Sequence, residues 1–90
     1  MKYSINRNVL NYAMSEKEQV LYDSESEKLL VINHTAALVW QQFEKGASVS
    51  EIIREVQKTY EEMDTEKIKR DILCYVDTLN EIGFLYIEEK

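Results

Sequence analysis

The sequence predicts an α+β domain, with a three-stranded antiparallel sheet, then three helices, then a short C-terminal strand. Three observations lead to this fold class. Segments with β-branched and aromatic residues fill the first third of the chain. Apolar residues then recur at helical spacing in three segments, and a last short apolar segment follows Gly83. The 90 residues contain no proline and no linker or repeat, so one domain over residues 1–90 is expected.

Three strands are expected before the helices. Residues 9–14 and 19–23 carry β-branched and aromatic side chains, and the polar sequence SEKE separates them. The polar sequence SESE then separates the second strand from residues 28–32. Two short loops between three strands predict an antiparallel meander. Residues 1–8 are an alternative contributor to the first strand.

The first helix is expected directly after the third strand. Asn33 is a suitable N-cap, with Thr35 as the alternative. Gly46 lies just past the expected helix end, where a left-handed residue is favoured. The apolar positions, spaced i, i+3, i+4 and i+7, are Ala36, Val39, Trp40 and Phe43.

Two further helices follow. Ser48 and Glu51 have the spacing of a capping box, and Asp64 or Thr65 can cap the third helix, which ends at Gly83. The expected core positions are Ile52, Ile53, Val56 and Tyr60 in the second helix, and Ile68, Ile72, Tyr75 or Val76, and Leu79 in the third. A strand over residues 84–87 after three helices makes this part similar to a winged helix-turn-helix.

Charge and composition restrict the possible partners. The formal net charge is −6, which disfavours nucleic acid and anionic membranes as partners. A single cysteine excludes an intramolecular disulfide and fits a reducing compartment. Apolar runs such as residues 29–32 and 36–40 are far shorter than a membrane span, and no signal-peptide pattern is present. A soluble, cytoplasmic protein is therefore expected.

The sequence offers little for catalysis. His34 is expected in the first turn of the first helix, and Cys74 in the middle of the third. A Cys–His nucleophile would need both side chains and an orienting third group to meet. A zinc site needs about four closely spaced ligands. There is no glycine-rich phosphate loop, and the carboxylates lie in polar segments. We therefore expect no enzymatic activity, no metal and no cofactor.

DNA binding is the alternative function to weigh, because of the helix-turn-helix pattern. The third helix carries a small basic cluster, but acidic residues are interleaved with it. A recognition helix usually presents a basic or amide-rich face. A solvated helix with i, i+4 pairs such as Glu66–Arg70 fits this pattern better. The cluster consists of Lys67, Lys69 and Arg70, among Asp64, Glu66, Asp71 and Asp77.

The strand over residues 28–32 is expected at the edge of the sheet, because it is the last of the meander. Alternation places Leu30 and Ile32 on one face, and Lys28, Leu29 and Val31 partly on the other. An exposed edge can pair with an added peptide strand. The strand alone leaves two readings open, since its second face could contact a ligand or be covered internally.

Five short motifs resemble the PqqD-like family in their order and spacing. These are VLYD at 20–23, LVIN at 30–33, TAALVW at 35–40, GASVSEII at 46–53 and LNEIGFL at 79–85. The resemblance covers about residues 9–87. Its most specific positions, which are expected to be structural, are Asn33, Trp40, Gly46 and Gly83.

This resemblance implies a non-catalytic recognition element for the leader segment of ribosomally synthesised, post-translationally modified peptides. The leader would add as a strand to the third strand of the sheet and lie between it and the third helix. The domain would deliver the peptide to a separate enzyme, such as a radical S-adenosylmethionine maturase or a leader peptidase and cyclase. The acidic charge of the chain would favour a leader that carries Lys or Arg.

The resemblance also implies a set of peptide-binding residues. The edge strand contributes Lys28, Leu29, Leu30, Val31 and Ile32. The facing stripe on the third helix is instead inferred from helical spacing (i, i+4, i+7, i+8, i+11), and it consists of Lys67, Asp71, Cys74, Tyr75 and Thr78. Only alternate residues of an edge strand direct their N–H groups outward. Of proline substitutions at Leu29 and Val31, one is therefore expected to be far more damaging to binding.

Overall fold

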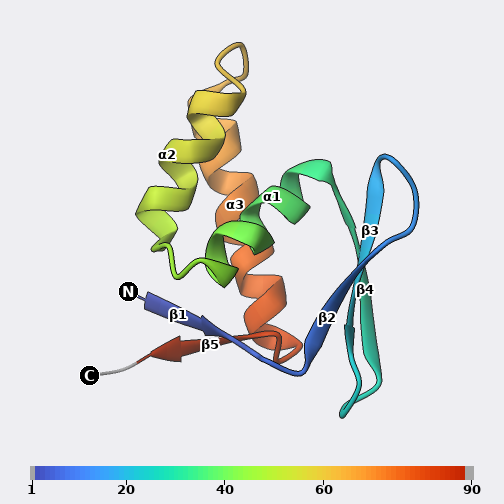
Figure 1. The fold of residues 1–90 in the computed structure, drawn as a ribbon. Coiled ribbons are helices and arrows are strands. Elements are labelled where there is room, and N and C mark those ends of the chain that lie inside the picture. Colours follow the sequence, from blue (N-terminus) through green and yellow to red (C-terminus); the bar gives the residue numbers. More distant parts are fainter. Residues whose placement is uncertain (1, 89–90) are drawn as a thin grey trace.

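The computed structural model describes residues 2–88 and confirms the predicted α+β fold (Figure 1). Its elements, in chain order, are β1 (Lys2–Ile5), β2 (Val9–Ala13), β3 (Glu18–Asp23), β4 (Lys28–Asn33), α1 (His34–Glu44), α2 (Val49–Thr59), α3 (Thr65–Glu81) and β5 (Leu85–Glu88). The three helices lie on one side of the β2-β3-β4 sheet (Figure 1). This arrangement leaves the other side of the sheet without a covering layer among the described residues.

The described strands form two antiparallel sheets. In the larger sheet β3 is central, with β2 and β4 on either side, as the predicted meander requires. In the smaller sheet β1 pairs with β5, so that Tyr3 lies opposite Ile87 and Ile5 opposite Leu85. The alternative that residues 1–8 contribute to the first strand of the meander is therefore wrong for residues 2–8, because Lys2–Ile5 form a separate strand beside β5. Residue 1 lies outside the described residues.

Capping residues fix where each helix begins. Asn33 is the N-cap of α1, since its Oδ1 accepts a hydrogen bond from the Ala36 N–H at 2.9 Å. Ser48 and Glu51 form the predicted capping box of α2. Asp64, rather than Thr65, caps α3. Because Asn33 is also the last residue of β4, the strand passes into the helix without a loop.

The core lies between the inner face of the larger sheet and the helices. Trp40, Leu21 and Phe84 are among its largest fully buried side chains. One predicted core assignment changes, and one open alternative is resolved. Ala37 is buried while Ala36 is only partly so, and Val76, not Tyr75, takes the buried position in α3. Adjacent residues of a helix are about 100° apart around its axis, and an apolar stripe is about as wide. The sequence pattern therefore does not decide which of two neighbouring apolar residues is buried. Ile53 and Tyr60 pack at the border of the core and are partly buried.

Candidate functional site

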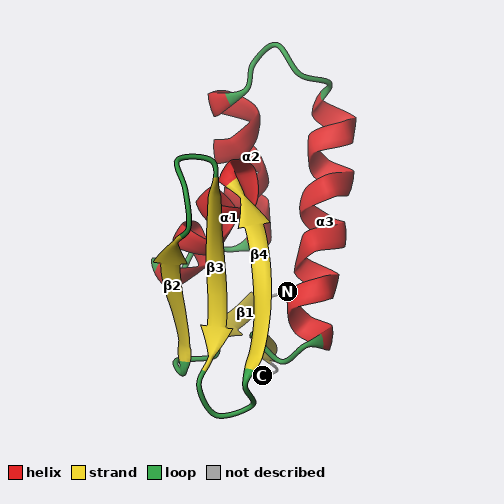
Figure 2. Ribbon diagram, turned by 90° about the vertical axis from the view of Figure 1, so that its right-hand side faces the viewer, coloured by secondary structure: helices red, strands yellow, loops and turns green. Residues whose placement is uncertain are grey.

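The β4 edge of the sheet is open. β4 pairs with β3 along one side, and no strand of the described chain pairs with its other side. In Figure 2 the outer face of the sheet points toward the viewer, and α3 runs beside β4. Within residues 2–88 β4 is therefore an edge strand, as the meander predicts. Of the two readings that the sequence left open for the second face of this strand, internal coverage does not hold, because Leu29 and Val31 are exposed.

Two hydrogen bonds at the ends of β3 establish which main-chain groups of β4 point outward. The Met14 N–H donates to the Glu18 carbonyl at 3.0 Å, so Glu18 faces β2. The Glu27 N–H donates to the Asp23 carbonyl at 2.8 Å, so Asp23 faces β4. The direction of the main-chain N–H and C=O groups alternates from residue to residue along an antiparallel strand. Asp23, Leu21 and Gln19 therefore all face β4. Their partners, which hydrogen-bond to β3, are Lys28, Leu30 and Ile32 in the same order.

Leu29 and Val31 therefore direct their N–H and C=O groups away from the sheet. They lie two positions apart and share one orientation, so the expectation that proline at one of them would be far more damaging than at the other was wrong. The relevant contrast is between this pair and its neighbour Leu30, which bonds to β3.

The side chains of β4 divide between two faces of the sheet. Lys28, Leu30 and Ile32 share the inner face, where Ile32 is only 3% exposed. Leu29 and Val31 lie on the outer face and are 59% and 46% exposed. The expectation that Lys28 lies partly with Leu29 and Val31 was therefore wrong, because the register pairs it with Asp23 on the inner side. Exposed Leu10 and Tyr12 of β2 continue this apolar outer face.

A cavity of about 370 Å³ opens at the C-terminal end of β4. Asn33 lies at its rim, and its walls come from α1, α2, α3 and the loop between α2 and α3. Its lining residues are Asn33, Thr35, Ala36, Val39, Val56, Tyr60, Met63, Lys67, Ile68, Asp71, Ile72 and Tyr75. We call the outward edge of β4 at Leu29 and Val31, together with this cavity, the β4–α3 site.

The cavity brings together some of the predicted α3 residues. Lys67, Asp71 and Tyr75 line it. Cys74 and Thr78 do not; Cys74 is exposed, and the Thr78 hydroxyl donates to the Cys74 carbonyl at 3.1 Å. The α1 and α2 walls were not predicted. A signal for the α1 wall was Ala36, a small residue at the border of an apolar stripe, which leaves room beside the helix.

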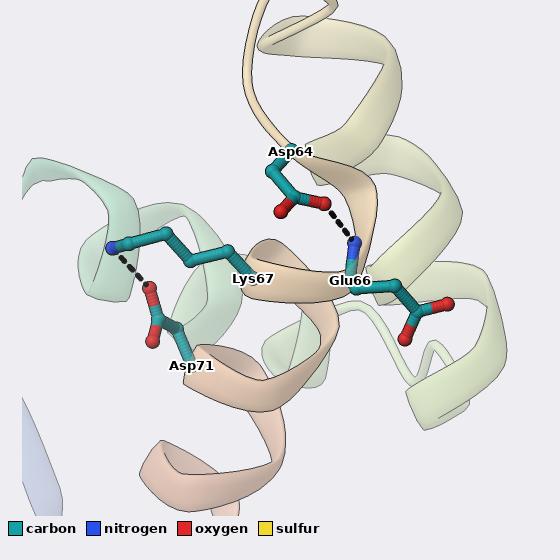
Figure 3. Close-up of polar contacts among 4 residues, drawn as sticks. All are labelled: Asp64, Glu66, Lys67 and Asp71. Atoms are coloured by element: carbon teal, nitrogen blue, oxygen red, sulfur yellow. Dashed lines mark hydrogen bonds and ion pairs between the residues drawn. The ribbon is translucent and has the colours of Figure 1, made fainter.

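The charged rim of the cavity is electrically balanced. The Lys67 Nζ lies 3.3 Å from Asp71 Oδ2, and both side chains are well exposed. Figure 3 shows this pair one turn apart on α3, close to the cap formed by Asp64 and the Glu66 N–H. The ion pair found on this helix is therefore Lys67–Asp71 rather than the expected Glu66–Arg70. Because Lys67 is paired, the basic cluster is weaker as a phosphate-binding surface than its sequence suggests.

Tyr75 forms an uncharged wall of the cavity. Burial raises the pKa of its hydroxyl well above the ordinary value, so the group stays protonated at physiological pH. The buried oxygen has no hydrogen-bond partner in the described structure. Buried hydroxyls usually find a partner, and a bound molecule can supply one. The cavity therefore suits a mainly apolar side chain that carries a polar group.

The described residues contain no grouping of His, Cys, Asp or Glu suited to a metal ion. Over the same part of the chain, none of the helices has the length and apolar character needed to cross a bilayer. His34 begins α1 on the surface, and Cys74 is exposed on α3.

Comparison with known proteins agrees with this architecture. The chain is similar to a solved structure described as "TbiB1 in Complex with the TbiA(beta) Leader Peptide", with 20% identity, a TM-score of 0.80, and coverage of 97% of this chain and 99% of the other. It is also similar to "Lasso peptide synthetase B1 complexed with the leader peptide", with 25% identity, a TM-score of 0.78, and coverage of 97% and 100%. No curated protein sequence matches the chain.

The sequence profile described as "Coenzyme PQQ synthesis protein D (PqqD)" matches residues 18–85, which include β3, β4, all three helices and Leu85, the first residue of β5. The matched segment thus contains the open strand and the cavity that make up the β4–α3 site. The resemblance read from the five sequence motifs is confirmed, and the chain belongs to the PqqD family.

Proposed function

We propose that this protein binds the leader segment of a precursor peptide by adding it as a strand to β4. The observation that carries the proposal is the open β4 edge with an apolar cavity at its end. The two similar solved structures were both obtained with leader peptides, which supports the same class of ligand here. The leader would extend the larger sheet by one strand beside α3.

The main-chain groups of Leu29 and Val31 would provide sequence-independent affinity. Each residue offers one N–H and one C=O, and each net hydrogen bond contributes about 1 kcal/mol. Apolar contacts add to this, and the loss of translational and rotational freedom subtracts from it. Dissociation constants from about 1 μM down to about 1 nM are within reach of such a balance.

Side chains of the added strand would alternate between two environments. One set would lie on the outer face beside Leu29 and Val31, where both side chains are exposed. The other set would point toward α3 and the cavity, where Lys67, Asp71 and Tyr75 would contact it. The inner set would therefore carry the side-chain specificity of the interaction.

The protein would act without catalysis and deliver its peptide to a separate enzyme. A radical S-adenosylmethionine maturase, or a leader peptidase with a cyclase, would receive the precursor. A reconstituted reaction tests this delivery step. Modification or cleavage of the full precursor should accelerate when this protein is added. A leader-less core peptide is the control and should show no acceleration.

Amide chemical shifts provide the direct test of binding. The TbiA(beta) leader, and the synthetic leader of any short precursor peptide encoded next to this chain's gene, are titrated into ¹⁵N-labelled protein. The shifts should cluster at residues 28–33 and along α3, and a scrambled peptide of the same composition should cause few. A leader that binds while these amides stay unperturbed would refute strand addition at β4. Salt-dependent binding of duplex DNA would instead support the alternative of a winged-helix regulator.

A further inference from the structure

A buried polar junction connects the two sides of the β4–α3 site. The Asn6 Nδ2 group donates to Asp23 Oδ2 at 3.0 Å and to the Gly83 carbonyl at 3.0 Å. Asp23 ends β3 and lies opposite Lys28, the first residue of β4. Gly83 follows the end of α3. One side-chain amide thus connects the turn that begins β4 to the residue that leads out of α3.

The remaining polar groups of Asn6 hold its amide in place. Its Oδ1 accepts from the Asn8 N–H at 2.9 Å, and its own N–H donates to the Phe84 carbonyl at 2.9 Å. Asn6 is 8% exposed and Asp23 is 4% exposed. A buried network with every member bonded favours a single arrangement of the segments that it joins.

Asp23 in turn shapes the turn before β4. Its Oδ1 accepts from the N–H groups of Glu25 and Ser26, at 2.9 and 3.3 Å. Its carbonyl accepts from the N–H of Glu27, a residue with a positive φ of 61°. The carboxylate therefore determines where Lys28 enters the sheet, and Asn6 determines where that carboxylate lies relative to α3.

We propose that Asn6 is a positioning residue, which fixes the spacing between β4 and α3 so that an added leader strand fits between them. The inference rests on the proposed function. A preformed site binds more tightly because less ordering is required on association. At the far end of β4, Asn33 and α1 already connect strand and helices. Asn6 supplies the matching connection at the near end.

Two sets of substitutions separate this role from general stabilisation. Asn6→Ala removes all three hydrogen bonds of the side-chain amide, to Asp23, Gly83 and Asn8. The exchange variant Asn6→Asp/Asp23→Asn restores a bond between the two positions with reversed polarity. It also places a carboxylate oxygen against the Gly83 carbonyl, so the connection to α3 is lost. Ser48→Ala is the matched control, because it removes a cap of similar worth from α2, outside the β4–α3 site.

Affinity is measured with the fluorescein-labelled synthetic leader, at a temperature where circular dichroism shows each variant fully folded. Asn6→Ala and the exchange variant should each bind about tenfold more weakly than wild type. In both, leader-induced amide shifts should persist in β4 and shrink at Asp71 and Tyr75. Ser48→Ala should lower the melting temperature and leave affinity unchanged.

Two results would overturn the positioning role. One is an exchange variant that binds the leader as tightly as wild type. The other is a Ser48→Ala variant that weakens binding as much as Asn6→Ala does. If wild-type protein binds neither this leader nor the TbiA(beta) leader, the proposed function itself is refuted. The positioning role depends on that function and is then refuted as well.

Discussion

Replacing Val31 with proline should abolish tight leader binding while sparing the fold. The Val31 N–H points away from β3, so proline removes no hydrogen bond of the sheet at this edge position. In the complex, the leader loses one hydrogen bond of about 1 kcal/mol, and its carbonyl is left without a donor at a cost of about 1–3 kcal/mol. The total of about 2–4 kcal/mol corresponds to roughly 30- to 1000-fold weaker binding.

Fluorescence anisotropy with the labelled leader gives the affinity, and thermal denaturation gives the stability. Val31→Ala is the control, because it shortens the side chain and keeps the N–H group. Leu30→Pro is the opposite case, because it breaks a hydrogen bond to β3 and leaves the partner carbonyl unsatisfied, which should destabilise the fold by about 2–4 kcal/mol. Leader affinity for Val31→Pro within threefold of that for Val31→Ala would refute strand addition at this edge.

Three further predictions concern stability, each measured by chemical denaturation. Burial raises the pKa of Asp23, but hydrogen bonds from Glu25, Ser26 and Asn6 outweigh it, so the pKa lies below its usual 3.8. The resulting stabilisation is present above pH 3.8 and disappears as the pH falls through the lowered pKa. The Asp23→Asn variant should lack this loss of stability in acid. If the variant and the wild type lose stability identically as the pH falls, Asp23 is not the responsible group. Lys67→Ala should change the free energy of unfolding by at most about 0.5 kcal/mol, because its ion pair with Asp71 is exposed. A loss of stability several times larger would contradict this estimate for the pair. Gly83→Ala should destabilise by about 1 kcal/mol through its φ of +82° alone, since a Cβ there meets no atom within 4 Å, whereas an unchanged stability would exclude backbone strain.

Local signals in the sequence were sufficient for the meander, the three helices and their caps. Ser48 with Glu51, and Asn33 before an apolar stripe, determine helix starts through interactions within a few residues. The β1–β5 pairing was not predictable in this way. β1 is four residues long and lies opposite a strand at the other end of the chain, so neither its periodicity nor a turn signal identifies its partner.

The candidate site was predictable in its strand and only partly in its helix. The edge position of β4 follows from meander topology, so it could be expected from loop lengths. The cavity depends on which side of α3 faces α1, and that is decided by packing between helices. Tyr75 and Val76 are adjacent and both apolar in part, and only the structure shows that Val76 enters the core while Tyr75 lines the cavity. The sequence did not point to Asn6, because the two partners of its Nδ2 group, Asp23 and Gly83, are distant in sequence.

The pairing of β1 with β5 has a consequence for engineering. Lys2 lies opposite Glu88, and Figure 1 shows β1 and β5 side by side, across the molecule from the β2-β3-β4 sheet. A short linker could therefore join residue 88 to residue 2, and new termini could be opened in the exposed loop between β2 and β3. An enzyme fused before β1 or after β5 would be tethered from nearly the same point, so fusion order should matter less than linker length for its reach to a bound peptide.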